Sequence, residues 1–189
     1  MKAFLCGVVT LLFALPVAAQ VGHEPASSPY TDLEYKQEFT ALFGYSRAQK
    51  DPAGVAPQSA PLVGLRYELN LVGPLALSSD VTAAFAKRDM IDPTKPAAQR
   101  IPVSEDATVY AADVALAMNL TGRKSWHHIV PQVRGGVGIM ATSAQDDASG
   151  VSFGTPFAFT FGGGLKFVPG GSNRVQVRAD FSERLFKLS

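Results

Sequence analysis

Residues 156–189 read PFAFTFGGGLKFVPGGSNRVQVRADFSERLFKLS, and this stretch decides the fold. From Phe157 to Phe167 large apolar side chains alternate with small or polar ones, and the alternation resumes after the turn 168–173. A period of two is the pattern of a β-strand with one apolar face. The stretch therefore predicts a hairpin whose apolar face needs a large apolar partner, either a protein core or a lipid bilayer.

The same alternation predicts five earlier strands. They cover residues 36–45, 62–71, 75–87, 108–120 and 129–141. The hairpin adds two more strands, the second of which covers about 173–186, so the chain has seven predicted strands and an all-β fold.

The connections between these strands alternate in length. Long and short connections follow one another in the order 46–60, 72–75, 88–106, 121–128, 142–155 and 168–173. Long loops on one side and short turns on the other are typical of an antiparallel up-and-down transmembrane β-barrel that is inserted from the periplasm. The sequence therefore predicts such a barrel.

The N-terminus has the pattern of a secretory signal peptide. Lys2 precedes an apolar run that ends in the small-residue site VAA, which places the mature start at Gln20. The only cysteine, Cys6, lies near the beginning of this run. The mature protein is therefore expected to have no disulfide and no acyl anchor.

The composition fits one exported domain. The 17 Lys and Arg residues against 16 Asp and Glu residues give a net charge of +1, which implies no strongly basic face for nucleic acid. No window after residue 20 has the length and apolarity of a transmembrane helix. We divide the chain into a signal peptide (1–19), a flexible periplasmic lead-in (20–35) and an outer-membrane barrel domain (36–189).

Along each predicted strand, the positions between the large apolar residues form the polar face. The size of the side chains on this polar face indicates that it is the concave one. The polar face contains many small residues, namely Gly64, Ala111, Ala115, Ala117, Gly136, Gly138, Gly162 and Gly164. Small residues are needed on the crowded inner side of a small barrel, and aromatic side chains suit the outer side. A soluble barrel with an apolar interior would carry long hydrophilic side chains outside. We therefore expect the apolar face to meet lipid.

The same parities place a balanced set of charges in the barrel lumen. This predicted charge network consists of Glu38, Arg66, Glu68, Asp80, Asp113, Arg134, Lys166, Arg174, Arg178 and Asp180. An ion-selective pore more often has a ring of one sign, and about eight strands leave an interior that side chains can fill. We expect a plugged lumen, and a narrow or gated conduit is the alternative.

The chain from Glu38 to Phe181 resembles the small outer-membrane β-barrel family, of the type of the outer-membrane protein A transmembrane domain. The hairpin GGGLKF, turn and NRVQVRADF is the part most similar to the family. The resemblance implies an eight-stranded barrel in the outer membrane of a Gram-negative-type bacterium. Members include adhesins, barrier-stabilising proteins, complement-resistance proteins and a few lipid-modifying enzymes, so the resemblance does not choose an activity.

Residues suited to catalysis are few. Ser125, His127 and His128 cluster in a predicted periplasmic turn, away from the outer leaflet where a lipid A deacylase would act. Trp126 suits an interfacial anchor, and adjacent histidines on a strand point to opposite faces. Asp146-Asp147 suits a solvated loop tip. We expect no catalytic, cofactor-binding or metal site.

These observations predict a non-enzymatic outer-membrane barrel. Its expected role is to stabilise the envelope or to present its long loops to an external ligand or surface, and its expected partner is outer-membrane lipid. A soluble periplasmic barrel that binds a small apolar ligand and an outer-membrane lipid-modifying enzyme are the alternatives.

The predicted strand number is odd, whereas bacterial single-chain barrels have an even number. An unclosed barrel would expose unpaired backbone groups to hydrocarbon. Three explanations would restore closure. The sequence is a truncated fragment, which we favour, or the segment 30–35 supplies a strand, or another chain completes the sheet.

Overall fold

The computed structural model describes residues 28–49, 57–90, 103–143, 154–169 and 175–186. Seven of the strands in these residues are long. They are β2 (Gln37–Ser46), β3 (Ala60–Asn70), β4 (Leu75–Met90), β5 (Val103–Asn119), β7 (Ile129–Thr142), β8 (Phe157–Phe167) and β9 (Val177–Phe186). Two strands of three residues complete the set, β1 (Tyr30–Asp32) and β6 (Lys124–Trp126).

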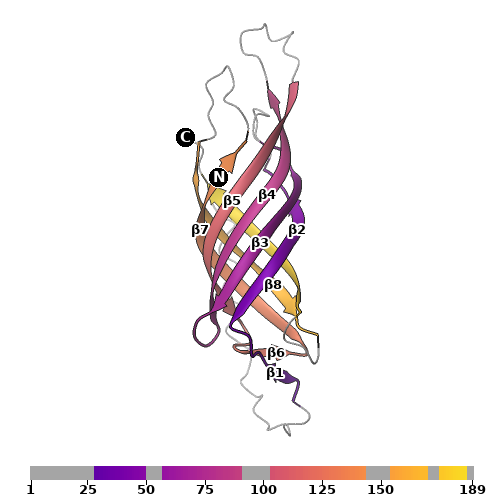
Figure 1. Ribbon diagram of the computed structural model, residues 1–189, viewed down its shortest axis with the longest axis vertical. Helices are drawn as coiled ribbons and strands as arrows, with labels where there is room; N and C mark the ends of the chain where they lie inside the picture. The colour runs from indigo at the N-terminus through magenta and orange to yellow at the C-terminus, as the bar shows by residue number, and fades with distance from the viewer. Residues whose placement is uncertain (1–27, 50–56, 91–102, 144–153, 170–174, 187–189) are drawn as a thin grey trace, which may run out of the picture.

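Each long strand pairs antiparallel with the next long strand along the chain, from β2 to β9. The strands are tilted against the long axis of the molecule (Figure 1). The predicted all-β, antiparallel up-and-down arrangement is confirmed.

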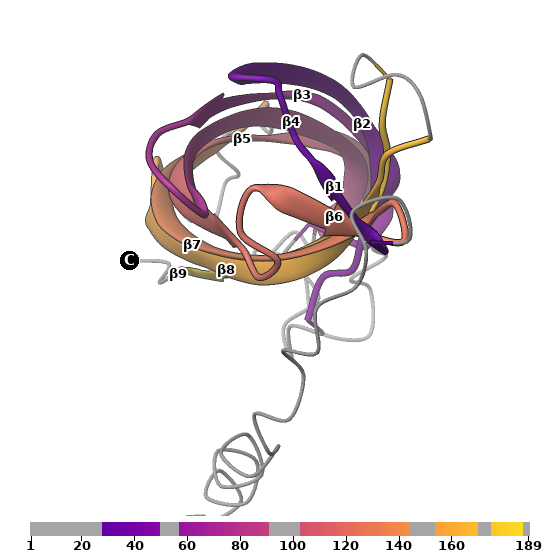
Figure 2. The ribbon, with the colours of Figure 1, turned by 90° about the horizontal axis from the view of Figure 1, so that it is seen from below.

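The sheet curves strongly when it is viewed from its end (Figure 2). Within the described residues, however, no backbone pairing joins the two edge strands, β2 and β9. The sheet is not closed, so the structure does not show the predicted barrel.

The predicted strands match the observed ones to within a few residues, except at three places. β4 and β5 extend further into the connection between them, to Met90 and from Val103, and β9 begins only at Val177. The third difference is the short antiparallel pair of β1 and β6, which the alternation of apolar and polar residues did not predict. β1 belongs to the predicted lead-in 20–35 and lies in the segment 30–35 that was one possible source of an extra strand, but it pairs with β6 and with neither edge strand.

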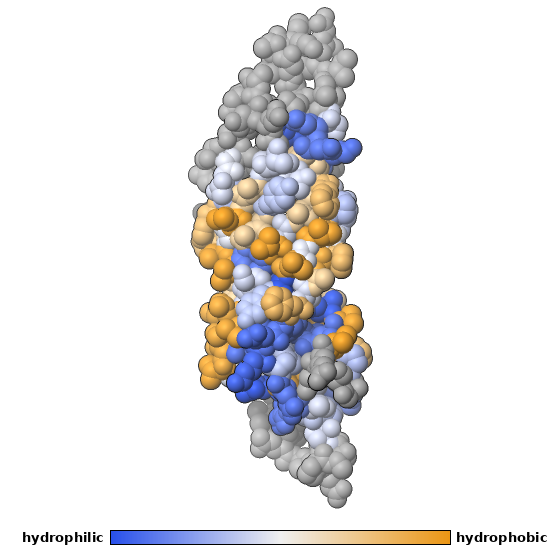
Figure 3. Space-filling model, viewed as in Figure 1, coloured by the Kyte–Doolittle hydropathy of each residue, from blue (hydrophilic) through white to orange (hydrophobic). Residues whose placement is uncertain are grey.

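The two faces of the sheet differ in the way that the alternation predicts. On β8, Phe157 and Phe159 are 54% and 60% exposed, whereas Ala158 and Thr160 are buried. The other long strands show the same difference, with large apolar side chains mostly on the outer surface and polar or small ones inside, although on the edge strand β9 the inner arginines, as whole residues, are only half-buried. On the face shown in Figure 3, apolar residues gather over the middle of the molecule.

Glycines on the inner face allow neighbouring strands to approach. A Cβ atom added to Gly136 would clash with the carbonyl oxygen of Val114 and lie 2.5 Å from the Cα atom of Ala115. Gly162 meets the backbone of Phe181 in the same way. The inner face therefore needs small residues at these positions because the concave side of a strongly curved sheet is crowded.

The pair of β1 and β6 lies across one end of the curved sheet (Figure 2). Behind it, Leu33, Val130 and Val168 form a small buried apolar cluster, against which Tyr35 packs. Backbone hydrogen bonds from Leu33 to Arg123 and from His127 to Pro29 hold the pair in place. This end of the interior is thus covered by the chain itself.

No helix in the part of the chain that the structure describes is long and apolar enough to span a membrane.

Two adjacent glycines test the crowding of the inner face. Gly136→Ala is expected to destabilise the protein by about 1–3 kcal/mol, because its methyl group has to displace the backbone of β5. Gly135→Ala is the matched control, since an added Cβ there has no neighbour within 4 Å. Urea unfolding of the refolded variants gives both values, and equal midpoints for the two variants would contradict the assigned faces.

Candidate functional site

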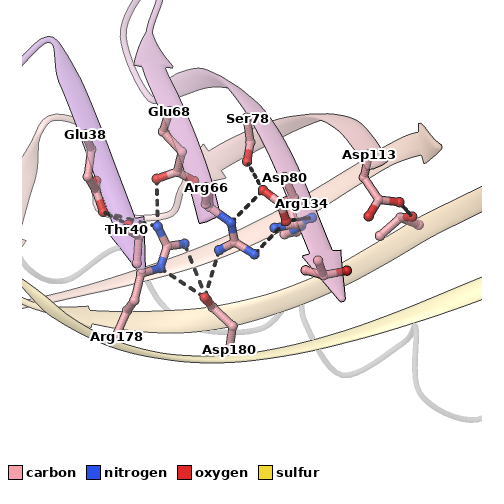
Figure 4. A network of polar contacts seen from close by, with 12 residues as sticks. Glu38, Thr40, Arg66, Glu68, Ser78, Asp80, Asp113, Arg134, Arg178 and Asp180 are labelled. Carbon is pink, nitrogen blue, oxygen red and sulfur yellow. Dashed lines mark hydrogen bonds and ion pairs between the residues drawn. The ribbon is translucent and has the colours of Figure 1, made fainter. Parts of the chain in front are cut away.

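The charged residues of the predicted network lie on the inner face of the sheet, where most of them are buried (Figure 4). Ion pairs connect Glu38, Arg66, Glu68, Asp80, Asp113, Arg134, Lys166, Arg178 and Asp180 with one another or with Arg184. Arg174 lies outside the described residues. We call this set, with Arg184 in place of Arg174, the charge network.

The lower part of the charge network, nearest β1 and β6, joins two carboxylates to two cations. Lys166 on β8 lies 2.8 Å from Glu38 and 2.6 Å from Glu68. Arg178 on β9 contacts the same two carboxylates at 3.2 and 2.8 Å and also bonds Gln132 at 2.7 Å. Each carboxylate therefore meets both cations, and the four side chains link β2, β3, β8 and β9 across the interior.

The middle part is centred on Arg66. Its guanidinium bonds both oxygens of Asp80 at 2.8 and 2.9 Å and reaches Asp180 on β9 at 2.8 Å. Arg134 on β7 approaches Asp80 from the other side, at 2.6 Å. Bidentate arginine–carboxylate pairs of this kind are strong and fix the geometry of both partners.

The upper part contains a residue that the sequence analysis missed. Arg184 on β9 bonds Asp113 on β5 at 2.7 Å, and the hydroxyl group of Thr160 donates to the same carboxylate at 2.6 Å. Arg184 has the same parity as Arg178 and Asp180, so continuing the alternation to the end of the strand would have found it.

A further ion pair, between a buried arginine and a half-buried glutamate, lies beyond the charge network, where β4 and β5 extend into their connection. The side chain of Arg88 is 2% exposed and contacts Glu105 at 3.3 Å. Arg88 lies on the same inner face of β4 as Asp80 and Thr82, but the predicted strand ended at residue 87. The polar interior is therefore longer than predicted.

The charge network is balanced in charge. It holds as many cations as carboxylates, and each charged group has a partner of opposite sign on another strand. The arrangement suits a structural role better than transport or proton transfer.

Tyr35 lies at the covered end, between β1 and β2. Burial, and to a smaller extent the nearby Glu38 carboxylate, raise the pKa of Tyr35 to about 12. The raised pKa extends the range in which the phenol group is neutral to higher pH, so no negative charge is added there beside Glu38 and Glu68.

The members of the Ser-His cluster each contact other groups. The hydroxyl group of Ser125 is buried and donates to the carbonyl oxygen of Thr31 at 3.4 Å. His127 packs edge-on against Trp126, and His128 against Phe167. Asp146-Asp147 lies outside the described residues. Among the described residues, no group of three or more His, Cys, Asp or Glu side chains could hold a metal ion.

Comparison of the chain with protein-family models, with curated proteins and with solved structures gave no match. The function proposed below therefore rests on the residues and geometry of this chain.

The charge network predicts a large difference between two lysines. Lys166→Met is expected to cost about 3–5 kcal/mol, because it leaves Glu38 and Glu68 buried with Arg178 as their one remaining cation. Lys124→Met is the control and should change stability by less than about 1 kcal/mol, since its pair with Asp32 is 3.8 Å long and exposed. Urea titration measures both. A loss below about 1 kcal/mol at Lys166 would contradict a structural network.

Proposed function

We propose that this protein is a non-enzymatic outer-membrane β-barrel with a plugged, charge-balanced lumen, which stabilises the envelope or presents its long loops to external partners. The observation that carries the proposal is the inverted distribution of polarity. Buried side chains are largely charged or small, and the large apolar side chains are largely exposed. A lipid bilayer is the solvent for which this distribution is favourable.

The extent of the exposed apolar surface supports lipid over water as the surrounding medium. Scattered exposed apolar residues are common on soluble proteins, but contiguous patches beyond a few hundred Å² mark interaction surfaces. Here the exposed apolar residues recur along every long strand, and they include nine of the phenylalanines, Phe39, Phe43, Phe85, Phe157, Phe159, Phe161, Phe167, Phe181 and Phe186. A partner that covers all strands at once is more simply a bilayer than a protein.

The connections support an orientation in the membrane. The connections 71–74, 120–128 and 168–176 lie at the end with β1 and β6, and 47–59, 91–102 and 143–156 join the strands at the other end. In the proposal the shorter set faces the periplasm and the longer set faces outward. Trp126 is exposed at the periplasmic end, where it would anchor the barrel at the lipid headgroups.

A closed barrel is part of the proposal, because open sheet edges are not tolerated in hydrocarbon. The strong curvature of the sheet and the ion pairs from β9 to β2 and β3 support closure. The proposal is an eight-stranded barrel of which seven strands are observed.

The interior argues against the two alternatives. A soluble barrel that binds an apolar ligand needs an apolar cavity, and here the interior is filled by ion pairs. A lipid-modifying enzyme needs a nucleophile next to a base, and Ser125 donates instead to a backbone carbonyl group.

Fractionation of cells that express the full chain tests the proposed location. The protein is expected in the outer-membrane fraction, retained after an alkaline carbonate wash and released by detergent. A maltose-binding periplasmic protein serves as the soluble marker. Recovery of the mature protein in the soluble periplasm without detergent would overturn the proposal.

A single position tests whether the apolar face meets lipid. Phe159→Arg is expected to cost about 2–4 kcal/mol in a detergent-to-lipid refolding titration, because it places a charge in the middle of the apolar band. Phe159→Leu keeps the position apolar and is the matched control. If the face met water, the arginine would be tolerated as well as the leucine.

A further inference from the structure

A polar hollow lies at the end of the sheet that β1 and β6 cover. It has a volume of about 180 Å³ and is lined by Lys36, Asn70, Leu71, Gly73 and Arg123. We call it the anion pocket. We propose that the anion pocket binds one phosphate group, carried either by the headgroup of a membrane lipid or by a small soluble phosphate ester.

Three segments that are far apart in the sequence form the anion pocket. Lys36 directly precedes β2, Asn70 ends β3 and leads into the turn before β4, and Arg123 lies in the turn between β5 and β6. The N–H group of Asn70 donates to the carbonyl oxygen of Lys36 at 2.9 Å, and that of Leu33 to the carbonyl oxygen of Arg123 at 2.9 Å. The side-chain amide of Asn70 donates to the carbonyl oxygen of Tyr35 at 2.9 Å. These bonds hold the backbone around the pocket in place.

The two cations of the anion pocket are Lys36 and Arg123, and both residues are exposed. Neither side chain makes an ion pair or a hydrogen bond with another described residue. By contrast, Lys124 next to Arg123 pairs with Asp32 at 3.8 Å, and the cations of the charge network are all paired. Arginine and lysine are the side chains that most often bind phosphate, and arginine can donate two parallel hydrogen bonds to it. Two unpaired cations beside one hollow therefore favour an anion as its occupant.

The remaining lining of the anion pocket adds no negative charge, since none of its five residues is acidic. Gly73 has a φ of 57°, and its N–H group has no hydrogen-bond acceptor in the part of the chain that the structure describes. Free N–H groups of tight turns are a recurring part of anion sites.

The size of the anion pocket fits a single small group. Its volume is below the roughly 300–1,000 Å³ of pockets for drug-sized ligands. A phosphate group offers more acceptor oxygens than a carboxylate does, so it can accept from donors that belong to three different segments. Phosphate is therefore the class of anion that suits the pocket best.

The rim of the anion pocket favours a lipid as the source of the phosphate. Leu71 lines the pocket and is 52% exposed, and the adjacent Val72 is 74% exposed. Apolar side chains beside cations suit the boundary between lipid headgroups and hydrocarbon. In the proposed orientation this boundary belongs to the periplasmic leaflet. The lipid source rests on the proposed membrane location, whereas the binding of a phosphate group does not.

Calorimetric titration of the refolded full chain in micelles of a non-ionic detergent tests the anion pocket, with protein-free micelles as the blank. Dihexanoyl phosphatidylglycerol presents the phosphate on a lipid, and glycerol 3-phosphate presents it without acyl chains. Saturable binding of at least one probe is expected, and sodium acetate is the ligand control. Binding of the lipid at least about tenfold tighter than that of glycerol 3-phosphate assigns the phosphate to a lipid. A smaller difference assigns it to a soluble ester.

Matched substitutions separate binding in the pocket from general attraction by positive charge. Lys36→Gln and Arg123→Gln are each expected to weaken binding at least about tenfold, because each removes a charged donor from the pocket. Lys124→Gln removes the same charge from the neighbouring position, which does not line the pocket, and should weaken binding by less than about twofold. The substituted side chains are exposed, and unchanged urea midpoints would show that the variants fold.

Three results would overturn the proposal. They are the absence of saturable binding of both probes, binding of acetate as tight as that of the phosphate probes, and equal weakening by Arg123→Gln and Lys124→Gln. Because glycerol 3-phosphate needs no membrane to bind, this test and the fractionation of cells can fail independently of each other.

Discussion

The ion pairs that cross the interior are the interaction on which the rest of this structure depends. A strand that buries Glu68 or Asp80 on its inner face is unfavourable alone, because a buried charge without a partner costs several kcal/mol. The partners come from strands that are distant in sequence, as with Lys166 and Glu68 or Arg184 and Asp113. The sheet has to curve for these side chains to meet, so curvature and charge pairing require each other.

The glycines and alanines of the inner face are the steric counterpart of these charges. Long side chains such as Arg66 and Arg178 extend into the interior only because their neighbours on the same face are small. Large residues are displaced to the outer face, where curvature separates them. The alternation of large apolar residues with small or polar ones therefore makes room for the charged side chains inside and also produces the apolar outer surface. This coupling explains why the polarity is inverted on every long strand and not only on the hairpin.

Period-two alternation was sufficient to locate all seven long strands and to decide which face of each is buried. It could not identify partners, since the pairing of Arg66 with Asp180 depends on register and curvature between strands far apart in sequence. It also missed β1 and β6, because three residues are too few for a periodic signal and their pairing depends on a turn in contact with the N-terminal segment. Arg88 was missed because the predicted strand ended at residue 87. Arg184 was missed because the assignment of inner-face residues was not continued to the end of the last strand. Closure of the sheet was expected from the even-number rule, but the edge strands β2 and β9 do not pair within the described residues.

The edge strands β2 and β9 are connected by side chains although no backbone ladder joins them in the described residues. In the ladders, hydrogen bonds set the distance between neighbouring strands, and the side chains adapt to it. Between β2 and β9 this order is reversed, because Arg178 and Glu38 connect strands that share no ladder. A bidentate or doubly paired guanidinium tolerates little change in distance, so the charge network limits how far β2 and β9 can separate. The interior is thereby organised independently of the strand that would close it.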